Sequence, residues 1–202
     1  SHDQGDAAWV YIQTDRPNVD RAVQGHCREA LLAEAGQRVA MTRNTGFGWT
    51  KHPYRPFGLG IPASPDAVGL LRAHRLTADE QYLAGALSAA QFGAGANPGN
   101  LCMTTGVGAA HAAHPLHLDG RISGQAPPEG LTVLGAQDMS HAVFAGDWGR
   151  KLLENHVYPE LETWPATDTY MDVFWNSTLC EYTIHEPMAR NMPSWASTVT
   201  SV

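Results

Sequence analysis

Apolar residues recur at every fourth position early in the chain, and this spacing constrains the fold more than any other feature of the sequence. The residues at this interval are Val23, Cys27, Leu31, Ala35 and Val39. Side chains four positions apart lie on the same face of an α-helix. The spacing therefore predicts a helix from about Asp20 to Thr42 whose apolar face packs against another element.

Two more helices are predicted to follow, with a very short connection between them. Ser64-Pro65 is a favourable helix start, because Ser caps an N-terminus and Pro is tolerated at the first helical position. We expect this helix to end near Leu76. Thr77-Ala-Asp-Glu80 has the spacing of a capping box and predicts the next helix, which Gly93 ends. Helices joined so closely must run antiparallel, as an αα-hairpin.

The composition changes between Ala94 and Gly135, where Gly, Pro, His and Ala dominate and the helical spacing disappears. These residues predict loops or short strands. Loops of this length in a compact domain are usually functional or disordered, and the mixture of His, Arg and apolar residues favours a functional loop. Further helices are expected from about Asp147 to His156 and from Pro187 onward, which would put Glu181 just before a helix start.

The overall composition excludes two classes of partner. Of the 202 residues, 43% are hydrophobic and 16% are charged, which suits one globular domain or part of a larger one. The net charge is −7 and the Lys and Arg form no basic cluster, so we expect no nucleic-acid partner. No apolar run is long enough to cross a membrane. Ser1-His2 looks like a cloning remnant, so we expect the native start to be missing, and the N-terminus does not show the location. The location is unknown, with a secreted or periplasmic one favoured.

The three cysteines, at positions 27, 102 and 180, are too few and too far apart to predict a disulfide framework or a zinc site. Each is interpreted as a small buried apolar residue. Cys180 precedes Glu181, but no nearby positive charge would activate its thiol as a nucleophile. We expect no cofactor.

Two carboxylates, Asp172 and Glu181, lie in an otherwise apolar and aromatic stretch from Tyr170 to Thr183. Burial beside the neighbouring aromatic rings would raise the pKa of Glu181, so that it could hold a proton near neutral pH. Carboxylates among aromatic residues are typical of sites that transfer protons next to a sugar ring. The alternative is that both are solvated acids of a loop.

Motifs along most of the chain resemble the C-terminal part of the family 9 glycoside hydrolases, the inverting cellulases and their relatives. Asp79 to Leu87, followed by Gly95-Ala-Asn-Pro98, resembles the helix of the family and its Gly-x-Asn-Pro turn. Thr104-Thr-Gly-Val-Gly108 and the segment from His114 to Arg121 resemble its Thr-Gly-x-Gly loop and Pro-His-His-Arg element. Tyr170 to Thr183 matches its second signature at the aromatic, Asp, Glu and Thr positions.

The chain also departs from these motifs. Ser177 replaces an aromatic residue of the signature, and Pro187-Met188 replaces Asn and a small residue. Leu116 and the extra Leu118-Asp119-Gly120 spread out the normally tight His-His-Arg element. These differences suggest a divergent member whose sugar subsites differ from those of the family.

The resemblance implies an all-α fold, a part of an (α/α)6 toroid made of helical hairpins with long functional loops. Residues 1–202 would be the C-terminal part, about half, of a single catalytic domain. It implies inverting hydrolysis of β-glycosidic bonds in a β-1,4-glucan or an oligosaccharide derived from it, with Glu181 as the general acid. Asp172 is expected to orient the site or bind sugar. The residues expected to contact sugar are His114, His117, Arg121, Tyr170, Asp172 and Trp175.

The catalytic base of the family comes from an Asp-Ala-Gly-Asp motif upstream of the matched segments. Asp3-Gln-Gly-Asp6 looks similar, but it lies too close in sequence to the middle helices, and we interpret it as a coincidence. We therefore expect an N-terminal half or a second chain to supply the base and to cover the open flank of the helices.

Other interpretations of the same residues stay open. His111, His114 and His117 have a spacing that would suit zinc or another divalent ion, although Pro115 prevents a regular helix there. The scaffold could instead be a non-catalytic module that binds carbohydrate after losing its base. An aromatic loop could stack on sugar rings or form a small core under a long loop, and its residues include Trp49, Tyr54 and Phe57.

Overall fold

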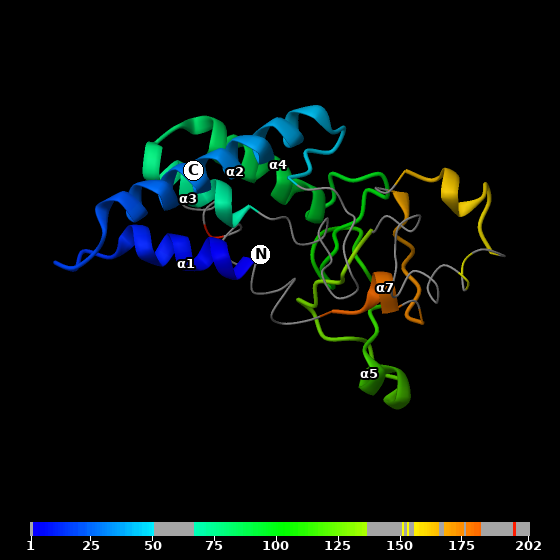
Figure 1. Cartoon of the computed structure of the whole chain (residues 1–202). Coiled ribbons are helices and arrows are strands. Elements are labelled where there is room, and N and C mark those ends of the chain that lie inside the picture. The colour runs from blue at the N-terminus through cyan, green and yellow to red at the C-terminus, as the bar shows by residue number, and fades with distance from the viewer. Residues whose placement is uncertain are drawn as a thin grey trace.

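The computed structural model describes residues 2–50, 67–136, 151, 153, 156–165, 168–175, 177–182 and 196. Two parts are evident in Figure 1, a helical part from the first half of the chain and a largely irregular part from the second. The helical part contains α1 (His2–Gln13), α2 (Arg21–Asn44), α3 (Val68–Thr77) and α4 (Glu80–Gly93). The irregular part contains α5 (Leu118–Ser123), a 3-10 helix η1 (Leu161–Thr163) and α7 (Ser177–Cys180).

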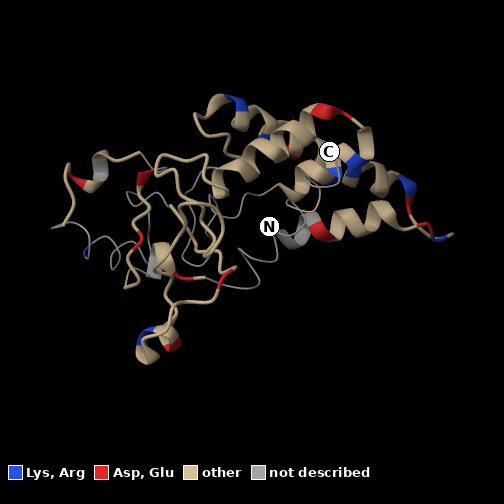
Figure 2. Cartoon of the chain, turned by 180° about the vertical axis from the view of Figure 1, so that it is seen from behind, with Lys and Arg blue, Asp and Glu red and all other residues tan. Residues whose placement is uncertain are grey.

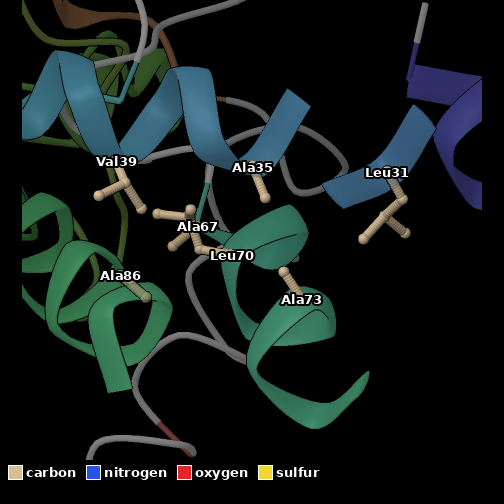
Figure 3. Packing of buried hydrophobic residues seen from close by; sticks show 7 residues of the cluster. All are labelled: Leu31, Ala35, Val39, Ala67, Leu70, Ala73 and Ala86. Carbon is tan, nitrogen blue, oxygen red and sulfur yellow. The ribbon is translucent and has the colours of Figure 1, made fainter. Parts of the chain in front are cut away.

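The helical part consists of two hairpins, α1 with α2 and α3 with α4, and α2 packs against both α3 and α4. Its core contains several small side chains, which let the helices approach closely (Figure 3), and consists of Leu31, Ala35, Val39, Ala67, Leu70, Ala73 and Ala86. A Cβ atom on Gly85 would lie only 3.3 Å from Leu70 Cδ1. The predicted four-residue stripe is therefore buried from Leu31 onward, whereas Val23, at the start of α2, is exposed.

The helix starts and ends follow from local hydrogen bonds. The helix predicted from about Asp20 to Thr42 is α2, and Asp20 caps it, because its Oδ1 accepts from the backbone N–H of Ala22 at 2.9 Å. The predicted capping box was wrong, since Thr77 is the last residue of α3 and Asp79 caps α4 by accepting from Gln81 N at 3.0 Å. That hydrogen bond lowers the pKa of Asp79. The predicted start at Ser64-Pro65 lies outside the described residues.

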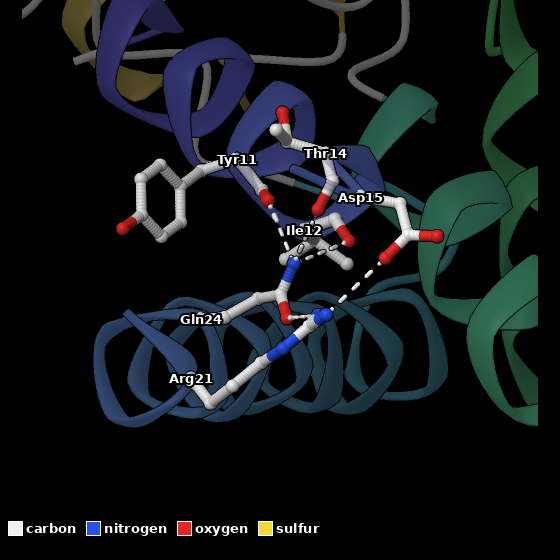
Figure 4. Close-up of polar contacts among 6 residues, drawn as sticks. All are labelled: Tyr11, Ile12, Thr14, Asp15, Arg21 and Gln24. Carbon is white, nitrogen blue, oxygen red and sulfur yellow. Dashed lines mark hydrogen bonds and ion pairs between the residues drawn. The ribbon is translucent and has the colours of Figure 1, made fainter. Parts of the chain in front are cut away.

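The α1–α2 connection is closed by one side chain (Figure 4). Gln24 Nε2 donates to the backbone oxygens of Tyr11, Ile12 and Thr14 at 3.0, 3.1 and 3.1 Å. These are carbonyls that the end of α1 leaves without helical partners. Arg21 fixes the same amide group by donating to Gln24 Oε1 at 2.8 Å.

A second set of contacts attaches α1 to α3. The guanidinium of Arg72 lies over the ring of Trp9, 5.4 Å from its centroid, and forms an ion pair with Asp6 at 2.7 Å. The carboxylate of Asp6, part of the motif that we interpreted as a coincidence, therefore holds two helices together.

The irregular part is held by isolated β-bridges between distant segments. They join Cys102 to His111, Thr104 to Thr132 and Val133 to Tyr182. Loops or short strands were predicted for Ala94 to Gly135, and this is what the structure has, except for the unpredicted helix α5. The predicted helix from Asp147 to His156 falls mostly outside the described residues, and of the one from Pro187 onward only Ala196 is described.

Two small cores stabilise the irregular part. The first consists of Phe92, Met103, Ala112 and Val133, and the second of Leu153, Leu161, Leu179 and Cys180. Tyr170 packs against both. Trp49 joins the first core with its ring edge-on to Phe92 at 5.7 Å, which supports the small-core interpretation of that loop. Its other aromatic residues, Tyr54 and Phe57, lie outside the described residues.

No helix in the described ranges is long and apolar enough to span a lipid bilayer.

Candidate active site

Glu181 follows directly after α7, on a segment whose backbone is paired with residues 133–135. Its carbonyl oxygen accepts from Leu134 N at 2.7 Å, and the oxygen of Leu179 accepts from Gly135 N at 2.9 Å. Tyr182 forms the bridge to Val133. The backbone at Glu181 is therefore fixed on both sides, and its side chain starts from a defined position.

The carboxyl group of Glu181 is partly buried. Its Oε2 is inaccessible to water and has no hydrogen-bond partner in the described part of the chain. Burial raises the pKa of Glu181, because a charged carboxylate loses hydration there and gains no donor. This is the direction expected from the sequence. Such a carboxyl group can keep its proton until a reacting group needs it.

Asp172 connects the signature stretch to the histidine loop. Its Oδ2 accepts from Ala113 N at 2.7 Å and from His114 Nδ1 at 3.1 Å. Its Oδ1 accepts from His114 N at 3.0 Å and from the Tyr170 hydroxyl at 3.0 Å. Because a carboxylate only accepts, Nδ1 of His114 must carry a proton. A neutral His114 then has its free acceptor at Nε2.

A second contact holds the same loop next to Glu181. Leu116 N donates to the oxygen of Cys180, the residue before Glu181, at 2.8 Å. The ring of the following residue, His117, lies 6.2 Å from the ring of Tyr182, centroid to centroid. The structure thus brings the histidine loop and the acidic stretch together.

His117 also builds the short helix α5. Its Nδ1 accepts from Gly120 N at 3.0 Å and caps the helix. A neutral His117 therefore carries its proton on Nε2 and presents a donor there. Arg121, on the same helix, lies over the ring of Phe174 at 3.0 Å from the centroid. Neither this stacking nor a histidine cap has a recognisable signal in the sequence.

The remaining predicted residues differ in exposure. Trp175 is about one-third exposed, at 36%, and its indole is accessible to a ligand. Tyr170 is largely buried, and burial raises the pKa of its hydroxyl. Burial also raises the pKa of the Cys180 thiol to about 12, in agreement with the expectation that this cysteine is not a nucleophile.

Solved structures that share the fold of this chain include endoglucanases. No family model matches the sequence, and no curated protein matches it either. A metagenome-derived glycoside hydrolase family 9 endoglucanase superposes with a TM-score of 0.75 and 21% identity over 96% of this chain. The chain has the family 9 fold.

Two other structures support this assignment. A thermostable endoglucanase from Alicyclobacillus acidocaldarius has a TM-score of 0.71 and 22% identity over 93% of this chain. A family 9 protein from Bacteroides ovatus has a TM-score of 0.68 and 19% identity over 96% of it. The chain spans only about a third of each solved chain, 32%, 34% and 32% respectively. The predicted all-α fold, part of an (α/α)6 toroid, is confirmed.

The three histidines of this chain do not converge on one metal position. Nδ1 of His114 is engaged by Asp172 and Nδ1 of His117 by Gly120 N, while the backbone of His111 pairs with Cys102. In the described ranges, no three His, Cys, Asp or Glu side chains converge to hold an ion. The alternative of a metal site at these three histidines was therefore wrong.

One cavity was not anticipated from the sequence. It has a volume of about 240 Å³ and is lined by Asn97, Pro98, Gly99, Leu101, Met103, Asp168 and Tyr170. Asn97, from the Gly-x-Asn-Pro turn, uses its amide within the protein by donating to the oxygens of Phe92 and Leu101, each at 2.8 Å. The turn therefore forms a wall of the cavity that is braced by these two hydrogen bonds.

Proposed function

We propose that this chain is the part of a glycoside hydrolase catalytic domain that carries the general acid, Glu181. The reaction is inverting hydrolysis of β-glycosidic bonds in a β-1,4-glucan or an oligosaccharide derived from it. The observation that carries the proposal is the Glu181 carboxyl group, with a raised pKa and a buried oxygen that has no partner in the described part. An acid of this kind protonates the departing glycosidic oxygen.

The two histidines support a sugar as the ligand, because they offer complementary groups. When both rings are neutral, His117 presents a donor at Nε2 and His114 presents an acceptor at Nε2. A hydroxyl group both donates and accepts, so either ring can bind one. Arg121 adds further donors, and Trp175 adds an exposed aromatic face on which a pyranose ring can stack.

The charge around this site favours an uncharged ligand. In the described irregular part, the Lys and Arg residues are Arg121 and Lys151 (Figure 2). They are outnumbered by the acids Asp119, Glu129, Glu160, Asp168, Asp172 and Glu181. A polyanionic chain would be repelled from such a surface, whereas a neutral glucan would not.

The base is proposed to come from outside this chain. Inversion needs a second carboxylate roughly 6.5–9.5 Å from the acid, with room for water between them. Asp172 is unsuitable, because both of its oxygens are engaged by donors of the protein. Since the chain spans about a third of the solved relatives, an N-terminal part or a second chain completing the toroid is the proposed source.

The test uses the protein with a complete catalytic domain and β-1,4-glucan oligosaccharides as substrates. Glu181→Gln is expected to lower turnover at least 100-fold while leaving oligosaccharide binding in place, and Glu160→Gln, at an exposed carboxylate, serves as the matched control. NMR of the first product formed should show the inverted anomer. Unchanged hydrolysis by Glu181→Gln would refute the proposal, and binding without any turnover in the unmodified protein would favour a carbohydrate-binding module.

A further inference from the structure

The carboxylate of Asp172 is fully occupied by the protein. Each of its two oxygens accepts two hydrogen bonds, and the donors are Ala113 N, His114 N, His114 Nδ1 and the Tyr170 hydroxyl, at 2.7–3.1 Å. An ionised carboxylate has about four acceptor positions. A group with all of them in use has none left for a sugar hydroxyl or an attacking water.

We propose that Asp172 is the positioning residue of this site. Its carboxylate holds the loop from Ala113 to His117 beside Glu181 and fixes the Nδ1–H tautomer of His114. This inference rests on the proposed function. Of the two roles expected for Asp172, orienting the site and binding sugar, it selects the first, and it also excludes Asp172 as the catalytic base. Its partners lie 58 and 59 residues away in the sequence.

The loop is held at two points that lie close together in sequence. Asp172 binds the backbone of Ala113 and His114, and the oxygen of Cys180 binds Leu116 N at 2.8 Å. Pro115, between the two points, is buried and has a fixed φ. The short segment therefore has little freedom, and the position of His117, the next residue, follows from these two contacts.

Tyr170 fixes Asp172 in turn. Its side chain packs against both small cores of the irregular part, and its hydroxyl donates to Asp172 Oδ1 at 3.0 Å. The orientation of the carboxylate is therefore determined by core packing and not by an exposed loop. An outer partner that orients a functional histidine commonly sets which ring nitrogen carries the proton.

This arrangement also accounts for the departure from the tight His-His-Arg element. The extra residues Leu118-Asp119-Gly120 start α5 directly after the anchored segment. The extra residues therefore follow the two contacts in sequence and form the start of α5, which protrudes from the irregular part (Figure 1). The histidine loop keeps its place next to Glu181 although the following residues differ.

The experiment compares Asp172→Ala, Asp172→Asn and Tyr170→Phe with the control Asp119→Asn, which alters an exposed acid on α5. Backbone amide exchange and imidazole ¹⁵N shifts are measured on the full chain. In Asp172→Ala we expect at least tenfold faster exchange at Ala113 and His114, and loss of the proton from His114 Nδ1 in the neutral ring. Tyr170→Phe should change both readouts in the same direction but less, and it tests the proposal even where Asp172→Ala fails to fold.

Turnover of oligosaccharide is measured on the protein with a complete catalytic domain. We expect kcat to fall about 100-fold in Asp172→Ala, as for a misplaced catalytic geometry, with KM changed less than threefold. A raised KM with unchanged kcat would instead identify Asp172 as a sugar ligand. Loss of the acidic limb of the pH profile in Asp172→Asn would identify it as the base. Each of these results overturns the proposal, and so does an Asp172→Ala variant in which amide exchange and the His114 tautomer are unchanged. Amide exchange tests the proposal even where no turnover is found.

Discussion

Replacing Gly120 by alanine tests how α5 and His117 are built, because two physical effects predict opposite outcomes. Alanine is favoured over glycine inside a helix by about 1 kcal/mol. At Gly120, however, a Cβ atom would lie 2.8 Å from His117 Nδ1 and 3.0 Å from the oxygen of Gln125. His117 Nδ1 accepts the capping hydrogen bond from Gly120 N, and Gln125 is held beside Gly120 because its N–H donates to the Gly120 oxygen at 2.9 Å.

Comparing the free-energy costs with the propensity gain shows whether Gly120→Ala stabilises or destabilises the fold. Overpacking of this kind costs about 1–3 kcal/mol, and losing the side-chain cap costs about 1 kcal/mol more. Together they exceed the propensity gain, so Gly120→Ala should be destabilising by about 1–3 kcal/mol. Gly36, inside α2, has no atom within 4 Å of an added Cβ. Gly36→Ala should therefore be stabilising by about 0.5–1 kcal/mol.

The assay is thermal unfolding of both variants, combined with the ¹⁵N shift of His117 Nδ1. A change of 1 kcal/mol corresponds to about 2–4 °C in Tm for a chain of this size. We expect Tm to rise in Gly36→Ala and to fall in Gly120→Ala, with His117 losing the hydrogen bond at Nδ1. If Gly120→Ala were as stable as Gly36→Ala and left the His117 shift unchanged, the close approach described for α5 would be refuted.

Three more predictions follow from other parts of the structure. Gln24→Ala should lower the free energy of unfolding, measured with urea, by about 1–3 kcal/mol, because carbonyls at the end of α1 lose the donor that Gln24 supplies. The control Gln37→Ala, at an exposed position of α2, should change this free energy by less than about 0.5 kcal/mol. Leu70→Ala should cost about 2–5 kcal/mol in the same assay, since Leu70 is completely buried between helices. Burial raises the pKa of Glu181 above its ordinary 4.5, so the folded chain binds this proton more tightly than the unfolded chain. The bound proton therefore contributes fully to stability below pH 4.5, and this contribution is lost as the pH rises through the pKa of the folded chain. The unfolding free energy of the unmodified chain should therefore fall relative to that of Glu181→Gln as the pH is raised. A difference that stays constant with pH would contradict a raised pKa of Glu181.

Local rules predicted the helical part because its elements depend mainly on neighbours in sequence. The four-residue spacing of apolar residues was enough to place α2. The cap of α4 was misassigned because Thr77 and Asp79 both suit that role, and the left-handed turn at Ala78, with φ of 56°, extends α3 to Thr77 and leaves Asp79 to cap the next helix. Val23 was expected in the core, but it lies on the first turn of α2, where it is 45% exposed.

The irregular part was less predictable because its geometry depends on contacts between distant residues. Spacing within Tyr170 to Thr183 identified Asp172 and Glu181, but it could not show that Asp172 binds Ala113, 59 residues away. The helix α5 was missed because its cap is His117, and histidine is not among the residues that usually signal a helix start. The stacking of Arg121 on Phe174 has no sequence signature either.

The two carboxylates of the signature stretch differ in their surroundings, and this difference separates their roles. Asp172 accepts four hydrogen bonds, whereas Oε2 of Glu181 is buried and accepts none in the described part of the chain. Donors directed at a carboxylate hold it in place, and a buried oxygen without donors favours a bound proton. Two acids nine positions apart can therefore serve one site, one by orienting its histidines and the other by giving up a proton. Removing one of the four donors of Asp172 by Tyr170→Phe is therefore expected to loosen the loop without altering the titration of Glu181.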